Sequence, residues 1–295
     1  MRGGRTSLYL PGQPIGNRFR VERLLGRGGA GSVLAATDLL TGRRVALKLL
    51  RSSVAGDPTA VERFRREALV LQAIDHPGVV SVEDAGALDD GTLYLALELL
   101  EGCTLAQRLR EGRPILPQHL APIVRGLCSA LEAIHAMGVL HRDVKPGNIF
   151  LPEQEEIARA SEVDRSVVVK LVDFGLAKVP GLEGLTARGV TVGTARYMAP
   201  EQLTAPVSLD ARVDVYATGV VLYEALSCHP AFLGTHERHP YEDILDGRFT
   251  PLLELEPELG AELAAVVERA MAKRPQDRFA SAAALADAFH DAVVR

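Results

Sequence analysis

Strand patterns dominate the first hundred residues of this chain, and helical patterns dominate the part after Gly102. Within the first part, residues 59–74 repeat apolar side chains at helical spacing. Strands and helices that are segregated along a sequence are typical of the α+β class. We therefore predict an α+β protein, in which a sheet with one helix is followed by a mainly helical part. Strands are predicted at residues 17–25, 32–38, 43–50, 79–85 and 92–99, and the later helices at 105–110, 117–137, 214–227, 240–245, 258–272 and 281–294.

The composition of the chain argues against several classes of protein. Its 295 residues are 47% hydrophobic, and its net charge of −5 disfavours nucleic-acid binding, which needs a basic surface. No apolar run approaches the roughly 18 residues that a membrane span requires. The three cysteines form no Cys-x-x-Cys pair and are interpreted as reduced, buried thiols. We expect a cytoplasmic protein, or the cytosolic domain of a membrane-anchored one.

A glycine cluster at residues 26–33 matches the pattern GxGxxGxV. Alone this pattern is weak, because it also occurs in dinucleotide-binding folds, where the glycines open a helix. Here a strand pattern follows, which predicts a β-hairpin with a glycine-rich bend. Such a bend can offer backbone N–H groups to phosphates without obstruction by side chains. The loop residues are Gly26, Arg27, Gly28, Gly29, Ala30 and Gly31, followed by Ser32 and Val33.

Lys48 lies inside the apolar strand pattern Val-Ala-Leu-Lys. A lysine is rarely buried without a negatively charged partner, which can be a carboxylate or a phosphate. Glu67 lies on the following helix, at the edge of its apolar stripe. The alternative is that Lys48 reaches solvent from the strand end and that Glu67 is a solvated helix charge. The glycine loop upstream favours phosphate binding.

Residues 141–150 read HRDVKPGNIF, and their Pro-Gly pair predicts a loop. Asp143 can orient a hydroxyl and accept its proton, Lys145 can neutralise a phosphoryl group, and Asn148 can hold a metal through its carbonyl oxygen. A strand pattern at 167–172 ends in Asp173-Phe-Gly, where a carboxylate can bind Mg²⁺. Each residue alone is ordinary in a loop, but the whole set in this order is not.

These motifs together resemble those of eukaryotic-type protein kinases, and details such as GTARYMAPEQ are similar to the bacterial serine/threonine subgroup. The resemblance runs from Phe19 to the C-terminus and includes the Ala-Pro-Glu triplet at 199–201. It implies the bilobal protein kinase fold, with an antiparallel N-lobe sheet, one αC helix and a mainly helical C-lobe. It also implies an N-terminal extension at 1–18, an N-lobe at 19–100 and a C-lobe at 101–295.

The resemblance implies ATP and Mg²⁺, or Mn²⁺ in its place, as cofactors. Asp143 would act as the base, Lys145 would stabilise the transferred phosphoryl group, and Asn148 and Asp173 would bind the metal ion. Lys48 would contact the α- and β-phosphates and pair with Glu67, beneath the glycine loop. The adenine base would lie between Val33 and Ala46 on one side and Phe150 on the other, with Leu97 behind it and the backbone of Glu98 to Leu100 as its hydrogen-bonding edge.

Lys145 and the Gly-Thr-Ala-Arg-Tyr stretch imply specificity for serine and threonine in protein substrates. Thr194 would bond to Asp143 and Lys145 as part of the substrate platform. Arg142 implies activation by phosphorylation of the loop at 176–198, with Thr186 as the main site and Thr191 as the second. The alternative is that these threonines are ordinary loop residues. Autophosphorylation in trans implies a homodimer as a partner assembly.

Two other classes of function compete with this interpretation. A pseudokinase would lack Lys48, Asp143 or Asp173, and all three are present. A kinase of small molecules would lack the Ala-Pro-Glu segment. Structural roles are also implied: Asp214 would hold the catalytic-loop backbone, and Glu201 would pair with Arg278. Residues 152–166 are interpreted as a surface excursion or a docking surface.

Overall fold

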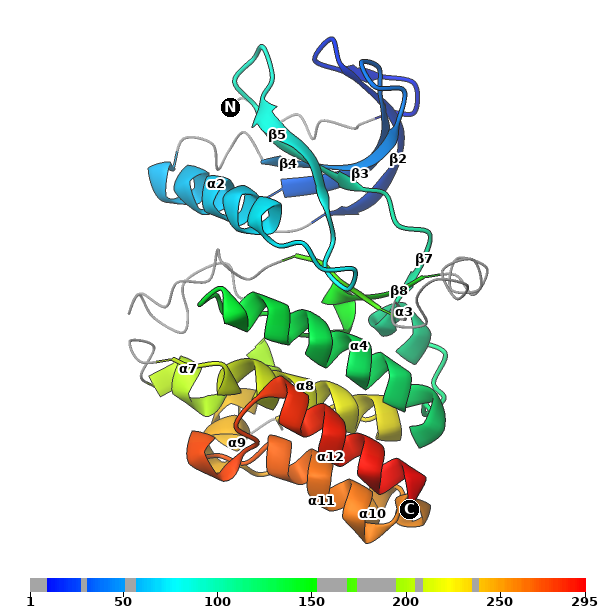
Figure 1. Ribbon diagram of the computed structural model, residues 1–295, viewed down its shortest axis with the longest axis vertical. Helices are drawn as coiled ribbons and strands as arrows, with labels where there is room; N and C mark the ends of the chain where they lie inside the picture. The colour runs from blue at the N-terminus through cyan, green and yellow to red at the C-terminus, as the bar shows by residue number, and fades with distance from the viewer. Residues whose placement is uncertain are drawn as a thin grey trace. The chain divides into compact units, whose positions relative to one another are not determined.

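The computed structural model describes residues 10–27, 31–50, 57–152, 169–173, 195–204, 209–234 and 239–295. The chain forms two compact units. Met1–Asp75 and Val80–Leu100 make the first, and His76–Val79 joins Glu101–Arg295 in the second. Figure 1 follows the chain from the sheet of the first unit to the helices of the second.

The first unit is a six-stranded antiparallel sheet with the strand order β1-β2-β3-β4-β6-β5. The predicted strands are present, with ends shifted by up to three residues. The two-residue strand β1 was missed because it is too short to show any alternation. The strands are β1 (Pro14–Ile15), β2 (Phe19–Arg27), β3 (Gly31–Asp38), β4 (Arg44–Leu50), β5 (Val82–Ala87) and β6 (Leu93–Glu98).

One face of this sheet carries the core of the first unit. Because paired residues of an antiparallel sheet point to the same side, alternate residues of neighbouring strands collect on one face. The ring of Phe19 meets that of Tyr94 edge to face at 5.1 Å between centroids. The core cluster is Phe19, Val21, Leu34, Ala36, Val45, Leu47, Leu49, Tyr94 and Ala96.

The helix α2 (Pro58–Ala73) is the one helix among the described residues of the first unit, as the sequence predicted. Asp57 caps its start, since its side chain accepts a hydrogen bond from the backbone N–H of Thr59 at 2.9 Å. Proline at the first helical position also fits this start. The helix lies beside the sheet in Figure 1. Its buried stripe is Phe64, Glu67, Ala68 and Leu71.

The second unit is mainly helical. Its longest helices are α4 (Pro117–Ala136) and α8 (Arg212–Ser227), and α8 is buried along nearly its whole length. That burial explains why α8 has apolar residues all round rather than on one stripe. Helix α12 packs against α4, and α11 packs against both α8 and α12 (Figure 1). The other helices are α3 (Leu105–Leu109), α7 (Pro200–Thr204), α9 (Pro240–Asp246), α10 (Leu252–Leu255), α11 (Ala261–Ala270) and α12 (Ala282–Val294).

A small three-stranded sheet in the second unit was not predicted as such. It has the order β7-β8-β9, from β7 (Gly102–Thr104), β8 (Ile149–Pro152) and β9 (Lys170–Leu171). Strands of two to four residues are too short to show a period. The interpretation of the cysteines as buried is wrong for Cys103 and Cys228, which are half-buried, while Cys128 is buried as expected.

A buried ion pair joins distant parts of the second unit. The guanidinium of Arg278 is fully buried and donates two bonds to the carboxylate of Glu201, at 2.6 and 2.8 Å. It also donates to the carbonyls of Ala272 at 2.7 Å and Arg212 at 3.1 Å, and lies 4.7 Å from the ring centroid of Tyr216. One arginine therefore connects the segment after α11 to the starts of α7 and α8.

We expect Glu201→Ala to lower the free energy of unfolding by about 3–5 kcal/mol, because it leaves a buried guanidinium without its counter-charge. Urea unfolding followed by circular dichroism measures the change. Asp277→Ala is the matched control, since it removes the partner of Arg274 in an exposed pair, where little change is expected. Equal stability of Glu201→Ala and the native protein would contradict this account.

Candidate active site

Three predicted site residues of the loop at 141–148 form one hydrogen-bonded cluster. The ammonium of Lys145 donates to Oδ2 of Asp143 at 2.8 Å, and Nδ2 of Asn148 lies 3.1 Å from the same oxygen. Nδ2 of Asn148 also donates to the backbone carbonyl of Asp143 at 2.9 Å. The side chain of Asp143 is 12% exposed, so its carboxylate is held in a defined place while part of it faces solvent.

Asp173 reaches this cluster through its backbone. Its carbonyl oxygen lies 3.2 Å from Nδ2 of Asn148, and its φ is 54°, in the left-handed region that non-glycine residues seldom adopt. Strained backbone of this kind persists where surrounding contacts fix it, and it often occurs at functional sites. Because the amide nitrogen of Asn148 is engaged with backbone, its carbonyl oxygen points away from that contact. This oxygen and the carboxylate of Asp173 are the hard donors that Mg²⁺ prefers.

Asp214 holds the backbone of the same loop. Its Oδ2 accepts from the N–H of His141 at 2.9 Å, and its Oδ1 accepts from the N–H of Arg142 at 2.8 Å. Arg142 has a φ of 63°, so the loop bends sharply one residue before Asp143. Burial alone would raise the pKa of Asp214, but these N–H groups and nearby imidazoles outweigh it, and the pKa lies below its ordinary value of 3.8.

Two histidines complete this support. His135, at the end of α4, donates from Nε2 to Oδ2 of Asp214 at 2.8 Å. His141 is fully buried, and burial lowers its pKa below the ordinary value of 6.5, so its ring is neutral at pH 7. Its Nδ1 accepts from the N–H of Asp143 at 3.2 Å. Sequence reasoning missed His135, although a polar residue in the apolar end of a buried helix was a usable signal.

In the first unit, Lys48 on β4 and Glu67 on α2 form an ion pair. Nζ of Lys48 donates to Oε1 of Glu67 at 2.6 Å, and the two side chains are 17% and 6% exposed. The pair joins the sheet to its helix and offsets the cost of burying Glu67. An ammonium that stays partly exposed can still meet a second anion.

The predicted nucleotide-binding residues of the sheet share one face. Val33 on β3 pairs with Lys48 on β4, and Ala46 on β4 pairs with Leu97 on β6, so all four point to the side opposite the core cluster. Leu97 is 7% exposed. Glu98 ends β6, and Leu100 follows it at the end of the unit.

The glycine cluster is described at its two ends. Gly26 on β2 pairs with Val33, and Arg27 ends that strand. A Cβ on Gly31 would lie 2.0 Å from the carbonyl oxygen of Leu49, so only glycine fits there. Gly28, Gly29 and Ala30 lie outside the described residues.

Of the other predicted site residues, one lies within the described residues and the rest lie outside them. Phe150 lies on β8, where it pairs with Thr104 and Lys170. Thr186, Thr191 and Thr194 lie outside the described residues, as does most of the excursion at 152–166.

The structure also shows a buried hydrogen-bonded pair, Tyr197 and Glu224, that was not predicted. The hydroxyl of Tyr197 donates to Glu224 on α8 at 2.5 Å. Burial raises the pKa of Glu224, and burial beside this carboxylate raises the pKa of Tyr197 as well. This contact ties the start of the Ala-Pro-Glu segment to the central helix of the second unit.

Two kinds of feature are absent from the part of the chain that the structure describes. No group of three or more histidine, cysteine, aspartate or glutamate residues is arranged to hold a metal ion there. No helix in the described ranges has the length and apolar character needed to cross a bilayer.

Comparison with known proteins identifies similar chains. The protein kinase domain model matches residues 19–290. A probable serine/threonine-protein kinase of Streptomyces coelicolor is 36% identical over 274 residues, 91% of this chain and 39% of the relative. Serine/threonine-protein kinase PknH of Mycobacterium tuberculosis is 37% identical over 275 residues, 93% of this chain and 42% of the relative. The chain thus spans about two fifths of the length of these curated relatives.

Solved structures agree with the fold. A crystal structure of the Mycobacterium tuberculosis PknI kinase domain matches with a TM-score of 0.72 and 28% identity, over 97% of this chain and 100% of that one. This match and the antiparallel and helical units confirm the predicted α+β protein kinase fold.

The depressed pKa of Asp214 predicts how stability depends on pH. A carboxylate whose pKa falls on folding stabilises the fold above its unfolded-state pKa, and this contribution is lost as pH falls through the folded-state pKa. We expect Asp214→Asn to be less stable than the native protein at pH 7, with a difference that shrinks as the pH falls below 3.8.

Thermal midpoints between pH 7 and pH 3 measure this effect. Asp291→Asn, on the exposed side of α12, is the matched control and should follow the native protein throughout. A constant deficit of Asp214→Asn across the whole pH range would show that its charge does not contribute to stability.

Proposed function

The chain belongs to the protein kinase domain family, and from this premise we propose that it transfers the γ-phosphoryl group of ATP to serine and threonine hydroxyls of proteins. One observation carries the proposal. Asp143, Lys145 and Asn148 form a hydrogen-bonded cluster at the end of a backbone that Asp214 holds in a sharp bend. Phosphoryl transfer depends mainly on such positioning and on electrostatic stabilisation.

Asp143 orients the attacking hydroxyl in this proposal and accepts its proton. Its carboxylate is already placed by two donors, so little reorganisation is needed when substrate arrives. Lys145 lies 2.8 Å from that carboxylate and would neutralise charge on the transferred group. The same lysine supports serine and threonine as acceptors.

Asn148 and Asp173 fit a divalent metal, because their amide and carboxylate oxygens are hard donors on one hydrogen-bonded unit. Bound Mg²⁺, or Mn²⁺ in its place, would neutralise the β- and γ-phosphate oxygens. Asn148 also anchors the loop, since its Nδ2 bonds the carbonyl of Asp143. One amide thus fixes the base while its oxygen remains for the metal.

The first unit supplies the residues proposed for the nucleotide. Lys48 would bind the α- and β-phosphates while Glu67 holds its ammonium in place. The backbone of the glycine cluster would lie over the phosphates, and Gly31 permits this through its close contact with β4. Val33, Ala46 and Leu97 share the face proposed for adenine, with Phe150 as the opposing contact and the backbone of Glu98 to Leu100 as its polar edge.

Activation is proposed to follow phosphorylation of the loop that holds Thr186 and Thr191. The Nε of Arg142 is buried and has no hydrogen-bond partner among the described residues, so this guanidinium can donate to a phosphate on that loop. Thr194 would bond to Asp143 and Lys145 once substrate binds. A transient homodimer would allow one copy to modify another.

The place of action is also a proposal. ATP-dependent modification of proteins fits the cytosol or the cytosolic side of a membrane. Signalling through bacterial serine/threonine kinases is the process that the names of the relatives support. Serine- and threonine-bearing proteins are the proposed partners.

Incubation with Mg²⁺ and γ-labelled ATP tests the activity. We expect label in the native protein, and a loss of at least about a hundredfold in initial rate in Asp143→Asn, because the base and its orientation are removed. Asp291→Asn should keep the native rate. Mass spectrometry of the labelled protein should find phosphate on Thr186 and, at lower occupancy, on Thr191.

Equal labelling of the native protein and Asp143→Asn would contradict the assignment of the base. Label on neither threonine in an active preparation would reject the phosphorylation sites alone. If the protein binds ATP in a thermal-shift assay but transfers no phosphoryl group to itself or to a basic substrate protein, the result would favour a pseudokinase.

A further inference from the structure

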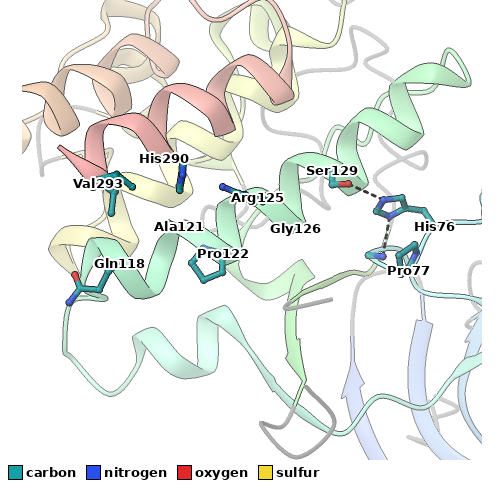
Figure 2. Close-up of a pocket in the computed structure, with 12 residues that line it drawn as sticks. His76, Pro77, Gln118, Ala121, Pro122, Arg125, Gly126, Ser129, His290 and Val293 are labelled. Carbon is teal, nitrogen blue, oxygen red and sulfur yellow. Dashed lines mark hydrogen bonds between the residues drawn. The ribbon is translucent and has the colours of Figure 1, made fainter. Parts of the chain in front are cut away.

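A cavity of about 520 Å³ lies in the second unit, among α4, the C-terminal end of α12 and the segment His76–Gly78. Figure 2 shows its lining side chains along one side of α4 and at the end of α12. None of the residues of the proposed active site lines it. The segment of α4 that lines the cavity runs from Gln118 to Ser129. At a helical rise of 1.5 Å per residue, this segment is roughly 16 Å long. This length matches about five residues of extended peptide.

One end of the cavity is a fixed hydrogen-bonded structure. The N–H of Gly78 donates to Nδ1 of His76 at 3.0 Å, so the neutral ring carries its hydrogen on Nε2. Nε2 then donates to Oγ of Ser129 at 3.1 Å (Figure 2). The hydroxyl hydrogen of Ser129 is therefore available to a ligand that accepts hydrogen bonds.

Arg125 is the one lysine, arginine, aspartate or glutamate among the described residues that line the cavity. Arg125 on α4 and His290 on α12 both line it, and neither carries an ion pair with any described residue. No aspartate or glutamate of the described residues lines it, although the whole chain has a net charge of −5. Asp287 lies one turn before His290 on α12, but it is not part of the lining. The cavity is thus a local basic site on an acidic protein.

Apart from Gln118, the remaining lining is apolar. Pro77, Ala121 and Pro122 contribute small surfaces, and Val293 and Val294 close the side formed by α12. Val294 is 71% exposed, although it is an apolar residue at the edge of a cavity. A ligand that matches this surface carries an anionic group beside small apolar groups.

We propose that this groove, lined by Arg125, Ser129, His290 and Val294, docks an acidic peptide segment of a partner protein. The guanidinium and the hydroxyl would bond a carboxylate or a phosphorylated side chain, and the valines would cover an apolar neighbour. Ser129 precedes His135, the anchor of Asp214, by six residues of the same helix, about 9 Å along its axis. The groove would therefore hold a partner at a distance from the reacting groups. Binding would not require phosphoryl transfer.

Display of random twelve-residue peptides on phage, panned against the native chain without ATP, tests the proposal. We expect enrichment of peptides with two or more aspartates or glutamates beside small apolar residues. Fluorescence polarisation with one enriched peptide should show weakening of about tenfold or more in Arg125→Glu, which reverses a rim charge, and in His290→Glu, which adds a negative charge to the rim. The milder Arg125→Gln should weaken binding less.

Arg248→Glu is the matched control, because it makes the same charge change on an exposed residue outside the groove, and it should bind within twofold of the native chain. The affinity for the peptide should fall with added salt, and Glu→Gln changes in the peptide should abolish binding. No enrichment, enrichment without acidic residues, or equal binding by Arg125→Gln and the native chain would overturn the proposal. The readout needs no ATP, so its failure is distinct from failure of the proposed activity.

Discussion

One buried carboxylate supports the geometry of the proposed active site. Asp214 accepts the backbone N–H groups of two consecutive residues, and this holds Arg142 in the left-handed region. The bend directs Asp143 toward Lys145 and Asn148, whose bonds then fix the base. A buried charge is costly unless donors surround it, and His135 supplies the third donor. The position of the base therefore depends on the central helix α8 and the end of α4.

The buried charges of the molecule serve two purposes. Arg278 is fully buried, bonded to Glu201 and to backbone carbonyls, and has no exposed surface to offer a ligand. Lys48 pairs with Glu67 but remains partly exposed, and Asp143 pairs with Lys145 but keeps 12% of its side chain exposed. Lys48 and Asp143 therefore keep surface that a substrate can reach, whereas the fully buried guanidinium of Arg278 only holds segments together.

The sequence predicted much of this arrangement because several patterns were long or specific. The strands near Lys48, the helix of Glu67 and several helices after Gly102 carry clear periods, and the loop at 141–148 carries an ordered set of functional groups. The strands β1, β7 and β8 were missed because two to four residues show no period, whereas β9 lies within the strand predicted at 167–172. His135 and the pair of Tyr197 with Glu224 were missed because their partners lie far along the chain. The left-handed backbone of Arg142 and Asp173 depends on tertiary contacts that no local pattern encodes.

The most direct test of the account is the steady-state rate of Asp214→Asn at pH 7, at a temperature where the variant is folded. The account predicts that kcat falls by a factor on the order of a hundred, because the base is misplaced by the loss of its backbone anchor. It also predicts a KM for ATP within about threefold of the native value, because the residues proposed for the nucleotide lie mainly in the first unit. A folded variant with the native kcat would contradict the claim that Asp214 positions the catalytic loop.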